Sequence, residues 1–550
     1  MSVDTDAATT SAPGRRRDPL VRNSLVGSAW TIVSRATGLG QSVAVAAVLG
    51  ATYLGNTYQA LNAIPNLLYY QLLAGSLFAS ILVPPLVLRD ERGDPDSAER
   101  LARGFLGTLL VAAVALAFVL LAAAPFLLRV FTAPVADPSI AAAQRRAGML
   151  FLLLFLPQIP LYVIAGTAAA LMNARGRFAL PAAGPTLENF MMIATLIVAA
   201  VIYGTGTSVE TVATSQILVL GLGTTTGVAI HAASQWLGAR RAGIVLLPSL
   251  GWRRPEVRAV LARIVPTLAF TGLAASQTAV VLVLANAVSG GLVAFQLAMS
   301  FFFLPIAVAV WPVARSLIPH LARLAKDHDD RFATEFRRAT DLVTLVTAPA
   351  AVAFLVLAAP IGRAIAFGAL EAGDGARLVS ASLAMLGLGV LVEGWFVLAT
   401  SAFYAVEDVR TPVRSMFVRV GVAVPVMLCS LAVDGAAVLI VLAAGMTVGA
   451  IAGASHAWRS LRTRLDVRPP VRRTMKTVLA SVAMVVPAAA TARLLTDVFP
   501  TGDAGDVLVV VGAAVVGLVT YASIQSVWMP SELRQLSALG WAKASEGGSR

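Results

Sequence analysis

The chain has 550 residues, of which 58% are hydrophobic and 13% are charged, and its mean hydropathy is +0.80. A single water-soluble globule does not have this composition, so we expect an all-α polytopic membrane protein. The formal net charge is +13 and the pI is near 10.7. Because the arginines lie at the ends of apolar stretches and not in one basic domain, no nucleic-acid partner is predicted.

A membrane-spanning helix needs about 20 apolar residues, and the chain offers about fourteen such stretches. In chain order, the expected transmembrane helices cover 24–50, 57–88, 103–131, 147–172, 180–203, 210–237, 259–286, 290–322, 340–368, 378–405, 413–433, 435–458, 475–496 and 505–528.

The first apolar segment contains an arginine, Arg35. The segment is too long for a cleaved secretory signal and lacks a convincing cleavage site, so we expect a retained helix. An ionised guanidinium at membrane depth costs roughly 2.5 to 3.5 kcal/mol and is tolerated where it faces a watery cavity or a polar partner. Arg35 therefore predicts a polar lumen between the helices. The alternative is a structural arginine bonded to backbone carbonyls or to Glu188.

The second segment carries a Pro-Asn pair, Pro65 and Asn66, which predicts a break in the helix. A break frees backbone polar groups, and membranes tolerate these only beside protein or a cavity. The pair therefore also indicates the lumen. Gly75 and Ser76, further along the same segment, are typical of helices that pack closely.

Lysine and arginine mark one side of the membrane. The connections after the even-numbered segments are basic, as with Arg240 and Arg241 or Arg337 and Arg338, whereas the odd connections at 203–211 and 286–291 carry neither residue type. Basic loops remain in the cytoplasm. We therefore expect a multi-pass protein of the inner (cytoplasmic) membrane with both termini cytoplasmic.

The sequence carries no motif for hydrolytic or metal chemistry. It holds no P-loop, GxSxG or HExxH pattern, and Cys429 is its single cysteine. An intrachain disulfide and a CxxC metal cluster are thereby excluded. We expect a transporter and not an enzyme, with no cofactor, no metal and no catalytic residue.

Two halves of the chain repeat at an offset of roughly 230 to 240 residues. Pro65 is matched by Pro305, and the connection that ends at Pro181 is matched by one that ends at Pro412. Each unit has six segments, which predicts parallel repeats with a substrate site at their interface. The expected divisions are a basic tail at 1–22, an N-lobe at 23–237, a linker at 238–258, a C-lobe at 259–458, a basic loop at 459–474, a helix pair at 475–528 and a cytoplasmic tail at 529–550.

Three motifs carry a family resemblance: LNAIPNLLYYQLLAGSLFASILVP, LMNARGRFALPAAGPTLEN and SAFYAVEDVRTPVR. They resemble signatures of the MurJ (MviN) family, the lipid II flippases of the MOP superfamily. The resemblance covers essentially the whole chain. It implies two six-helix lobes in a V around a cationic cavity, with the last two helices forming a groove for a polyprenyl tail.

The resemblance also implies a function and partners. The chain would flip a polyprenyl-diphosphate-linked saccharide lipid, lipid II or a related envelope glycan, by alternating access during peptidoglycan synthesis. Membrane lipids and proteins of cell-wall synthesis are the other partners expected. The alternatives are a non-transporting or partner-dependent paralogue that regulates envelope synthesis and, less favoured, a small-molecule exporter of the MATE group.

The chain departs from the family pattern at several polar positions. Arginines usual in the family are matched by Gln41, Tyr69, Tyr70 and Ser300, and an acidic residue is matched by Asn56. If the chain binds a diphosphate, other cations must replace those arginines.

Candidate functional residues fall into two groups. The expected cavity residues are Arg35, Asn66, Arg263, Arg315 and Arg363. The expected gating or structural residues are Pro65, Gly75, Ser76, Asn173, Arg177, Pro185, Glu188, Asn189, Pro305 and Pro412. Glu188 is in addition a candidate proton site, because burial can raise the pKa of a carboxylate into the physiological range. Glu393 lies deeper in its segment than most loop charges.

Overall fold

The computed structural model describes residues 19–67, 69, 82–243, 246–262, 264–327, 329–371, 373–499 and 503–528. This part of the chain is helical, and thirteen of its helices are long and apolar enough to cross a membrane. Each coincides with one predicted segment. The second predicted segment, 57–88, lies partly outside the described residues. The predicted all-α polytopic class is confirmed.

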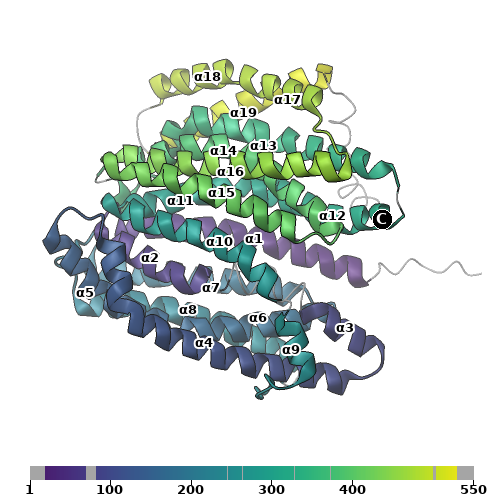
Figure 1. Ribbon diagram of the computed structural model, residues 1–550. Helices are drawn as coiled ribbons and strands as arrows, with labels where there is room; N and C mark the ends of the chain where they lie inside the picture. The colour runs from purple at the N-terminus through teal and green to yellow at the C-terminus, as the bar shows by residue number, and fades with distance from the viewer. Residues whose placement is uncertain are drawn as a thin grey trace, which may run out of the picture.

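The first lobe lies lowest in Figure 1. Its helices are α1 (Pro19–Leu49), α2 (Tyr53–Leu67), α3 (Val83–Glu91), α4 (Pro95–Thr132), α5 (Pro138–Phe155), α6 (Gln158–Ala174), α7 (Ala179–Tyr203) and α8 (Thr214–Arg241). α5 and α6 together form one predicted span, and Pro157 marks the joint between them.

The second half of the chain lies above the first lobe in the same view, except for α9, which lies low beside α4. The second lobe contains α9 (Pro255–Ala262), α10 (Ile264–Leu284), η2 (Ala285–Ala287), α11 (Gly291–Pro305), η3 (Ile306–Val310), α12 (Trp311–Lys326), α13 (Arg331–Ala364), η4 (Gly368–Leu370), α14 (Gly375–Ala405), α15 (Arg410–Leu428), η5 (Cys429–Ala432) and α16 (Ala436–Leu465). The segment η3 is a π-helix directly after Pro305. Proline removes a backbone donor, and local π geometry relieves that gap inside a membrane helix.

Three C-terminal helices pack against α13 on the side away from the first lobe (Figure 1). They are α17 (Val471–Ala483), α18 (Val485–Val498) and α19 (Asp503–Trp528). Polar contacts attach them: the Tyr521 hydroxyl donates to the Leu345 carbonyl at 2.8 Å, and Arg363 Nε pairs with Asp506 Oδ1 at 3.1 Å. These helices are therefore an attachment to the second lobe.

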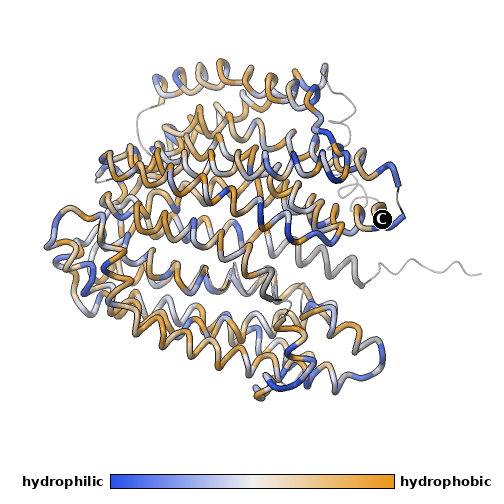
Figure 2. The backbone as a smooth tube through the Cα atoms, viewed as in Figure 1, coloured by the Kyte–Doolittle hydropathy of each residue, from blue (hydrophilic) through white to orange (hydrophobic). Residues whose placement is uncertain are grey.

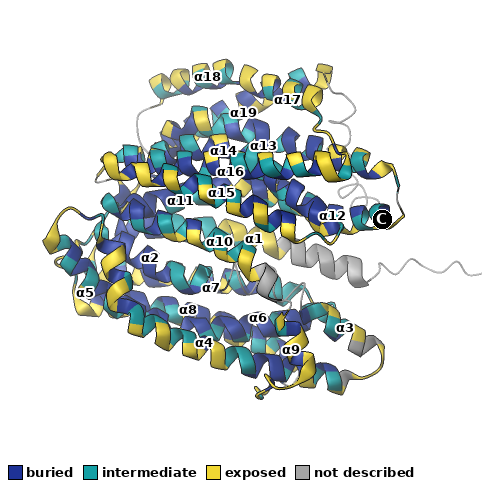
Figure 3. Cartoon of the chain, in the orientation of Figure 1, coloured by how far each residue is buried: buried dark blue, intermediate teal, exposed yellow. Residues whose placement is uncertain are grey.

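The distribution of polar residues fits a bilayer. Hydrophobic stretches occupy the middle of the helices, and hydrophilic residues gather in the connections at the two ends of the bundle (Figure 2). Exposed residues follow the outward faces of the helices (Figure 3). Exposed large apolar side chains include Phe118, Val201 and Val486. Lipid replaces water around such faces, so their exposure carries no hydrophobic penalty.

The two lobes are joined at one end of the bundle, which we call the closed end. Asn56 of α2, Gln144 of α5 and Asn286 of η2 are all fully buried there. Asn56 Nδ2 donates to Asn286 Oδ1 at 3.1 Å, and Gln144 Nε2 donates to the same oxygen at 2.9 Å. Buried amides bonded to one another hold a unique geometry, because separating them leaves polar groups unsatisfied. This cluster therefore links the lobes.

Glycine permits the close backbone approach at this end. Gly290, at φ +68°, lies directly against Ala51 of the other lobe, and Gly50, also at φ +68°, lies against Ala369. A Cβ atom at either glycine would collide with the opposing chain, and positive φ disfavours other residue types. The lobes therefore touch through their backbones.

Candidate functional site

A cavity of about 980 Å³ lies between the two lobes. Its walls come from α1, α2 and α7 of the first lobe and from α10, α11, α14 and α15 of the second. Its polar lining residues include Arg35, Gln41, Ser42, Asn62, Asn66, Glu188, Asn189, Gln277, Ser300, Glu393 and Arg419. A cavity at the interface of two repeats, lined by charged groups, is the geometry expected of a transport site.

Arg35 lies on the α1 wall of this cavity. Its guanidinium carbon is 4.9 Å from the ring centroid of Trp311, which belongs to α12 of the other lobe. Stacking on an aromatic face helps to hold the guanidinium in position at the cavity wall. Asn189 supports the same stretch of α1, because its Nδ2 donates to the Ser34 carbonyl at 3.3 Å and to Thr37 Oγ1 at 3.1 Å.

Glu188 sits in a buried polar cluster on the first-lobe wall. Its Oε2 is 2.8 Å from His231 Nδ1, and its Oε1 is 2.7 Å from the Tyr162 hydroxyl. That hydroxyl is also 2.7 Å from Asn66 Oδ1, so its single proton can be donated to either oxygen. Tyr69 stacks on Tyr162 with ring centroids 4.3 Å apart. Glu188 is thus bonded to α6 and α8.

A buried ion pair lies on the second-lobe wall. Arg419 Nη1 is 2.8 Å from Glu393 Oε2 and 3.0 Å from Oε1. Arg419 Nε also donates to Gln277 Oε1 at 3.3 Å, and its guanidinium carbon lies 5.2 Å from the centroid of the Phe396 ring. The side chains of Arg419 and Glu393 are only 9% and 12% exposed. A pair this deep is held in place by its own bonds, since neither charge has bulk water to replace them.

Sequence reasoning missed Arg419 and His231, although it noted Glu393. The signal for Arg419 was present, because it stands inside the predicted segment 413–433 just as Arg35 stands inside the first. An intramembrane arginine is a candidate functional residue wherever it occurs. His231 carried a similar signal, because it stands inside the predicted segment 210–237 and ionisable side chains are rare within membrane spans.

Of the other residues predicted to line the cavity, the structure places one on its wall and two elsewhere. Asn66 lines the cavity. Arg363 does not line it, because it is at the end of α13 and pairs with Asp506 of α19. Arg315 is exposed on α12 and is likewise not a lining residue. Neither side chain is therefore among the residues that line the cavity in this structure, and a substrate contact by Arg363 or Arg315 stays a prediction. Arg263 lies outside the described residues.

The helix break predicted at Pro65 and Asn66 stays a prediction, because most of the residues after Leu67 in this segment lie outside the described part of the chain. Pro65 lies inside α2, which continues to Leu67, and Asn66 Nδ2 donates to the Asn62 carbonyl at 2.9 Å. The Asn66 side chain is thus hydrogen-bonded to the backbone of its own helix, one turn earlier. Gly75 and Ser76 lie outside the described residues.

The other predicted structural residues occupy helix ends and bends. Asn173 and Arg177 flank the turn between α6 and α7, where the Arg177 N–H donates to the Met172 carbonyl at 2.9 Å. Pro185 lies inside α7 and lines the cavity. Pro305 ends α11, and Pro412 is buried in the first turn of α15, where its missing N–H has no helical partner to lose.

Positions where the chain departs from the family pattern have defined roles. Gln41 and Ser300 line the cavity, and the Ser300 hydroxyl is 3.0 Å from the Ser42 hydroxyl across the lobe boundary. Tyr69 is buried in the Glu188 cluster, and Asn56 is part of the closed end. Of these positions, Gln41 and Ser300 therefore face the site directly.

Comparison with known proteins decides the family. The family model described as "Lipid II flippase MurJ" matches residues 45–511. This chain belongs to the MurJ family. It is 27% identical over 470 residues to a probable lipid II flippase MurJ of Rhizobium meliloti, covering 82% of this chain and 83% of the relative. It is also 27% identical over 405 residues to the lipid II flippase MurJ of Burkholderia cenocepacia, covering 72% and 75%.

Solved structures show the same fold. A lipid II flippase MurJ in an inward closed conformation matches with a TM-score of 0.73 at 16% identity, covering 92% of this chain and all of that one. An inward-facing MATE family multidrug transporter of the MOP superfamily matches with a TM-score of 0.60 at 12% identity, covering 80% and 98%. MurJ membership makes this chain a multi-pass membrane protein of a transporter family.

Proposed function

We propose that this chain flips a polyprenyl-diphosphate-linked glycan precursor, lipid II or a related envelope glycan, across the cytoplasmic membrane. The observation that carries the proposal is a polar cavity between two repeat lobes that is shut at one end by interlobe hydrogen bonds. Alternating access requires such a site, reached from one side at a time. The curated relatives named as lipid II flippases support the substrate class.

Charge placement supports an orientation for this cycle. The closed end carries the connections at 203–214 and 285–291, which hold no lysine or arginine, whereas the opposite end carries Arg240, Arg241, Arg337 and Arg338. Basic connections stay in the cytoplasm. The closed end is then external, both termini are cytoplasmic, and the cavity is reached from inside.

The diphosphate headgroup and the polyprenyl chain of the substrate prefer different surroundings. The diphosphate carries about two negative charges, and such charge is costly to desolvate without cationic partners. Arg35 lines the cavity and would contact it. The polyprenyl chain is apolar and would remain in lipid, along the outward faces of α17 to α19, so that only the headgroup crosses.

Depletion rescue tests the proposal. The chain is expressed in a bacterium whose resident lipid II flippase can be switched off, and survival with normal peptidoglycan synthesis is the expected result. The matched negative variant is Arg35→Ala at equal membrane abundance. Lysis in spite of normal abundance would favour the alternative, a paralogue that regulates envelope synthesis without transport.

Reconstitution gives the direct measurement. Purified chain in liposomes should expose fluorescent lipid II to an external quencher, while a fluorescent phospholipid in the same vesicles stays protected. Loss of protection for both lipids would indicate leaky or unspecific scrambling and would contradict the proposal.

A further inference from the structure

Glu188 and Arg419 occupy equivalent positions in the two repeats. Pro181 and Pro412, which end the matched connections, are separated by the same number of residues as Glu188 and Arg419. The packing agrees: Gly227 of α8 lies against the Glu188 carbonyl, and Gly449 of α16 lies against the Arg419 carbonyl. The cavity therefore carries a carboxyl group on one lobe and a permanently charged guanidinium at the matching place on the other.

The equivalence extends to the partners of these residues. Tyr162, which bonds Glu188, precedes it by the same interval as Glu393 precedes Arg419. Gly453 of α16 leaves room for the arginine, because a Cβ atom there would lie 2.9 Å from Arg419 Cβ. The packing of α16 against α15 thus leaves space for Arg419.

Arg419 retains donor capacity beyond its present bonds. A guanidinium has five N–H groups. Within the described part of the chain, Nη1 is engaged by Glu393 and Nε by Gln277, while Nη2 has no hydrogen-bond partner. Two donors of Arg419 are therefore available beside the cavity.

Gln277 provides an independent sign of a missing ligand. Its side chain is only 4% exposed, and its Oε1 accepts from Arg419. Its Nε2 is buried without a hydrogen-bond partner among the described residues. A buried donor left unsatisfied costs free energy, so such a group in a lining residue indicates an acceptor that arrives from outside.

We propose that Arg419 and Gln277 form a phosphate-binding site on the second-lobe wall, with Glu393 as its built-in competitor. In the empty cavity the Glu393 carboxylate neutralises Arg419. An incoming phosphate oxygen takes over donors of Arg419 and accepts from Gln277 Nε2. The diphosphate of a prenyl lipid fits this chemistry, and that choice of ligand rests on the proposed function, whereas the anion site itself does not.

The site also accounts for the missing family arginines. Gln41 and Ser300 leave the first-lobe wall and the α11 wall of the cavity with fewer cations than the family pattern supplies. Arg419 supplies one cation from the opposite wall, and Glu393 neutralises it until an anion binds. An arginine fork suits phosphate geometry better than a point charge does.

Equilibrium binding to the full-length chain in detergent tests this inference. The probes are farnesyl diphosphate, inorganic pyrophosphate and, as an uncharged match, farnesol. Glu393→Gln removes the competitor and should tighten farnesyl diphosphate binding about tenfold. The double variant Glu393→Gln/Arg419→Gln, which leaves no buried unpaired charge, should bind at least tenfold more weakly than the unmodified chain. Farnesol binding should be the same in all forms.

Arg363→Gln is the matched control, because Arg363 also forms an ion pair but outside the cavity, and it should leave the affinity unchanged. Pyrophosphate binding with the same variant pattern would assign the site to free phosphate as well as to lipid. Unchanged diphosphate affinity in both Glu393→Gln and the double variant would overturn the site, even if the chain flips lipid II. The expected variant pattern without any flipping would uphold the site and refute the proposed function.

Discussion

Arg419 of α15 and Glu188 of α7 stand at matching positions of the two repeats and line one cavity with opposite charges. Each is bonded within its own lobe, Arg419 to Glu393 and Glu188 to His231. The walls can therefore move apart without breaking either pair. The buried amide bonds that join the lobes lie at the closed end and involve neither pair.

A cysteine pair at Ser42 and Ser300 should lock the lobes together. The two hydroxyl oxygens are 3.0 Å apart across the lobe boundary, close enough for an oxidised cysteine pair to form with small adjustments. In a Cys429→Ser background, oxidation of Ser42→Cys/Ser300→Cys should stop lipid flipping in liposomes, and a reductant should restore it. Single-cysteine variants serve as controls. Flipping at the full rate by a fully cross-linked sample would show that this contact does not open during transport.

Arg35 should be needed for transport and not for folding. Because hydrogen bonds to a charged group are worth about 1.5 to 3 kcal/mol, Arg35→Ala should reduce flipping about tenfold or more. Arg35→Lys should be intermediate, since an ammonium keeps the charge but loses the forked donors. The control is Arg315→Ala, an exposed arginine on the neighbouring α12. Equal flipping by the alanine and lysine variants and the unmodified chain would make Arg35 a structural residue.

The His231 to Glu188 pair should contribute strongly to stability. His231→Ala removes a partner from a carboxylate that is 3% exposed, and a buried charge left unpaired costs about 3 to 5 kcal/mol. The melting temperature in detergent should fall markedly. The second variant, Glu188→Gln/His231→Ala, should recover part of the loss, because it removes the charge and keeps a group that can accept from Tyr162. A double variant less stable than the single one would contradict this account.

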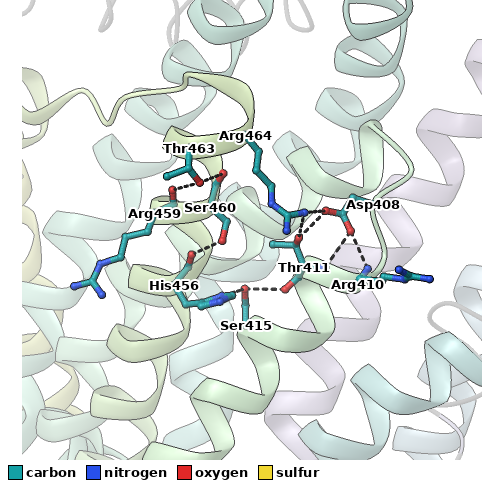
Figure 4. A network of polar contacts seen from close by, with 9 residues as sticks. All are labelled: Asp408, Arg410, Thr411, Ser415, His456, Arg459, Ser460, Thr463 and Arg464. Carbon is teal, nitrogen blue, oxygen red and sulfur yellow. Dashed lines mark hydrogen bonds and ion pairs between the residues drawn. The ribbon is translucent and has the colours of Figure 1, made fainter.

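Asp408 should stabilise the start of α15 in a pH-dependent way. It accepts from Thr411 Oγ1 at 2.6 Å, from the Arg410 and Thr411 N–H groups, and from Arg464 (Figure 4). Burial acts to raise the pKa of Asp408, but these bonds and the Arg464 charge outweigh it and lower the pKa below the ordinary 3.8. The folded state thus favours the ionised form, so its stabilisation is full above that value and is lost as the pH falls through the lowered pKa.

The measurement for Asp408 is thermal unfolding of Asp408→Asn across the pH range. At pH 7 the variant should be less stable by about 1 kcal/mol, the size of a typical net hydrogen-bond contribution. The difference should shrink towards zero in acid, below the ordinary pKa. Asp434→Asn, in the exposed connection before α16, is the control and should change little. A difference that is constant with pH would exclude the charge as its cause.

The orientation is tested by labelling single cysteines in intact cells. In the Cys429→Ser background, a membrane-impermeant maleimide should label cysteines at Glu210 and Asp434, both at the proposed external end. It should reach a cysteine at Asp330 only after permeabilisation, because the connection that contains it is basic. Strong labelling of the 323–338 connection in intact cells would reverse the assignment.

The sequence by itself determined the number and position of the long membrane-spanning helices in the described part of the chain. Thirteen of the predicted segments coincide with helices that can span a membrane, because the length of an apolar run is a local property set by bilayer thickness. The family could likewise be inferred from local motifs. Arg35 could be singled out because a charge inside an apolar run is visible without any partner.

Only the tertiary structure decided which charges meet. Arg363 and Arg315 stood near helix ends as Arg35 stood within one, yet Arg363 pairs with Asp506 and Arg315 is exposed. Arg419 contacts Glu393 and Gln277, which are 26 and 142 residues away from it in the sequence and belong to other helices. A side chain's direction depends on the rotation of its helix and on which helices pack beside it. These are set by contacts summed over the whole bundle and have no local signature.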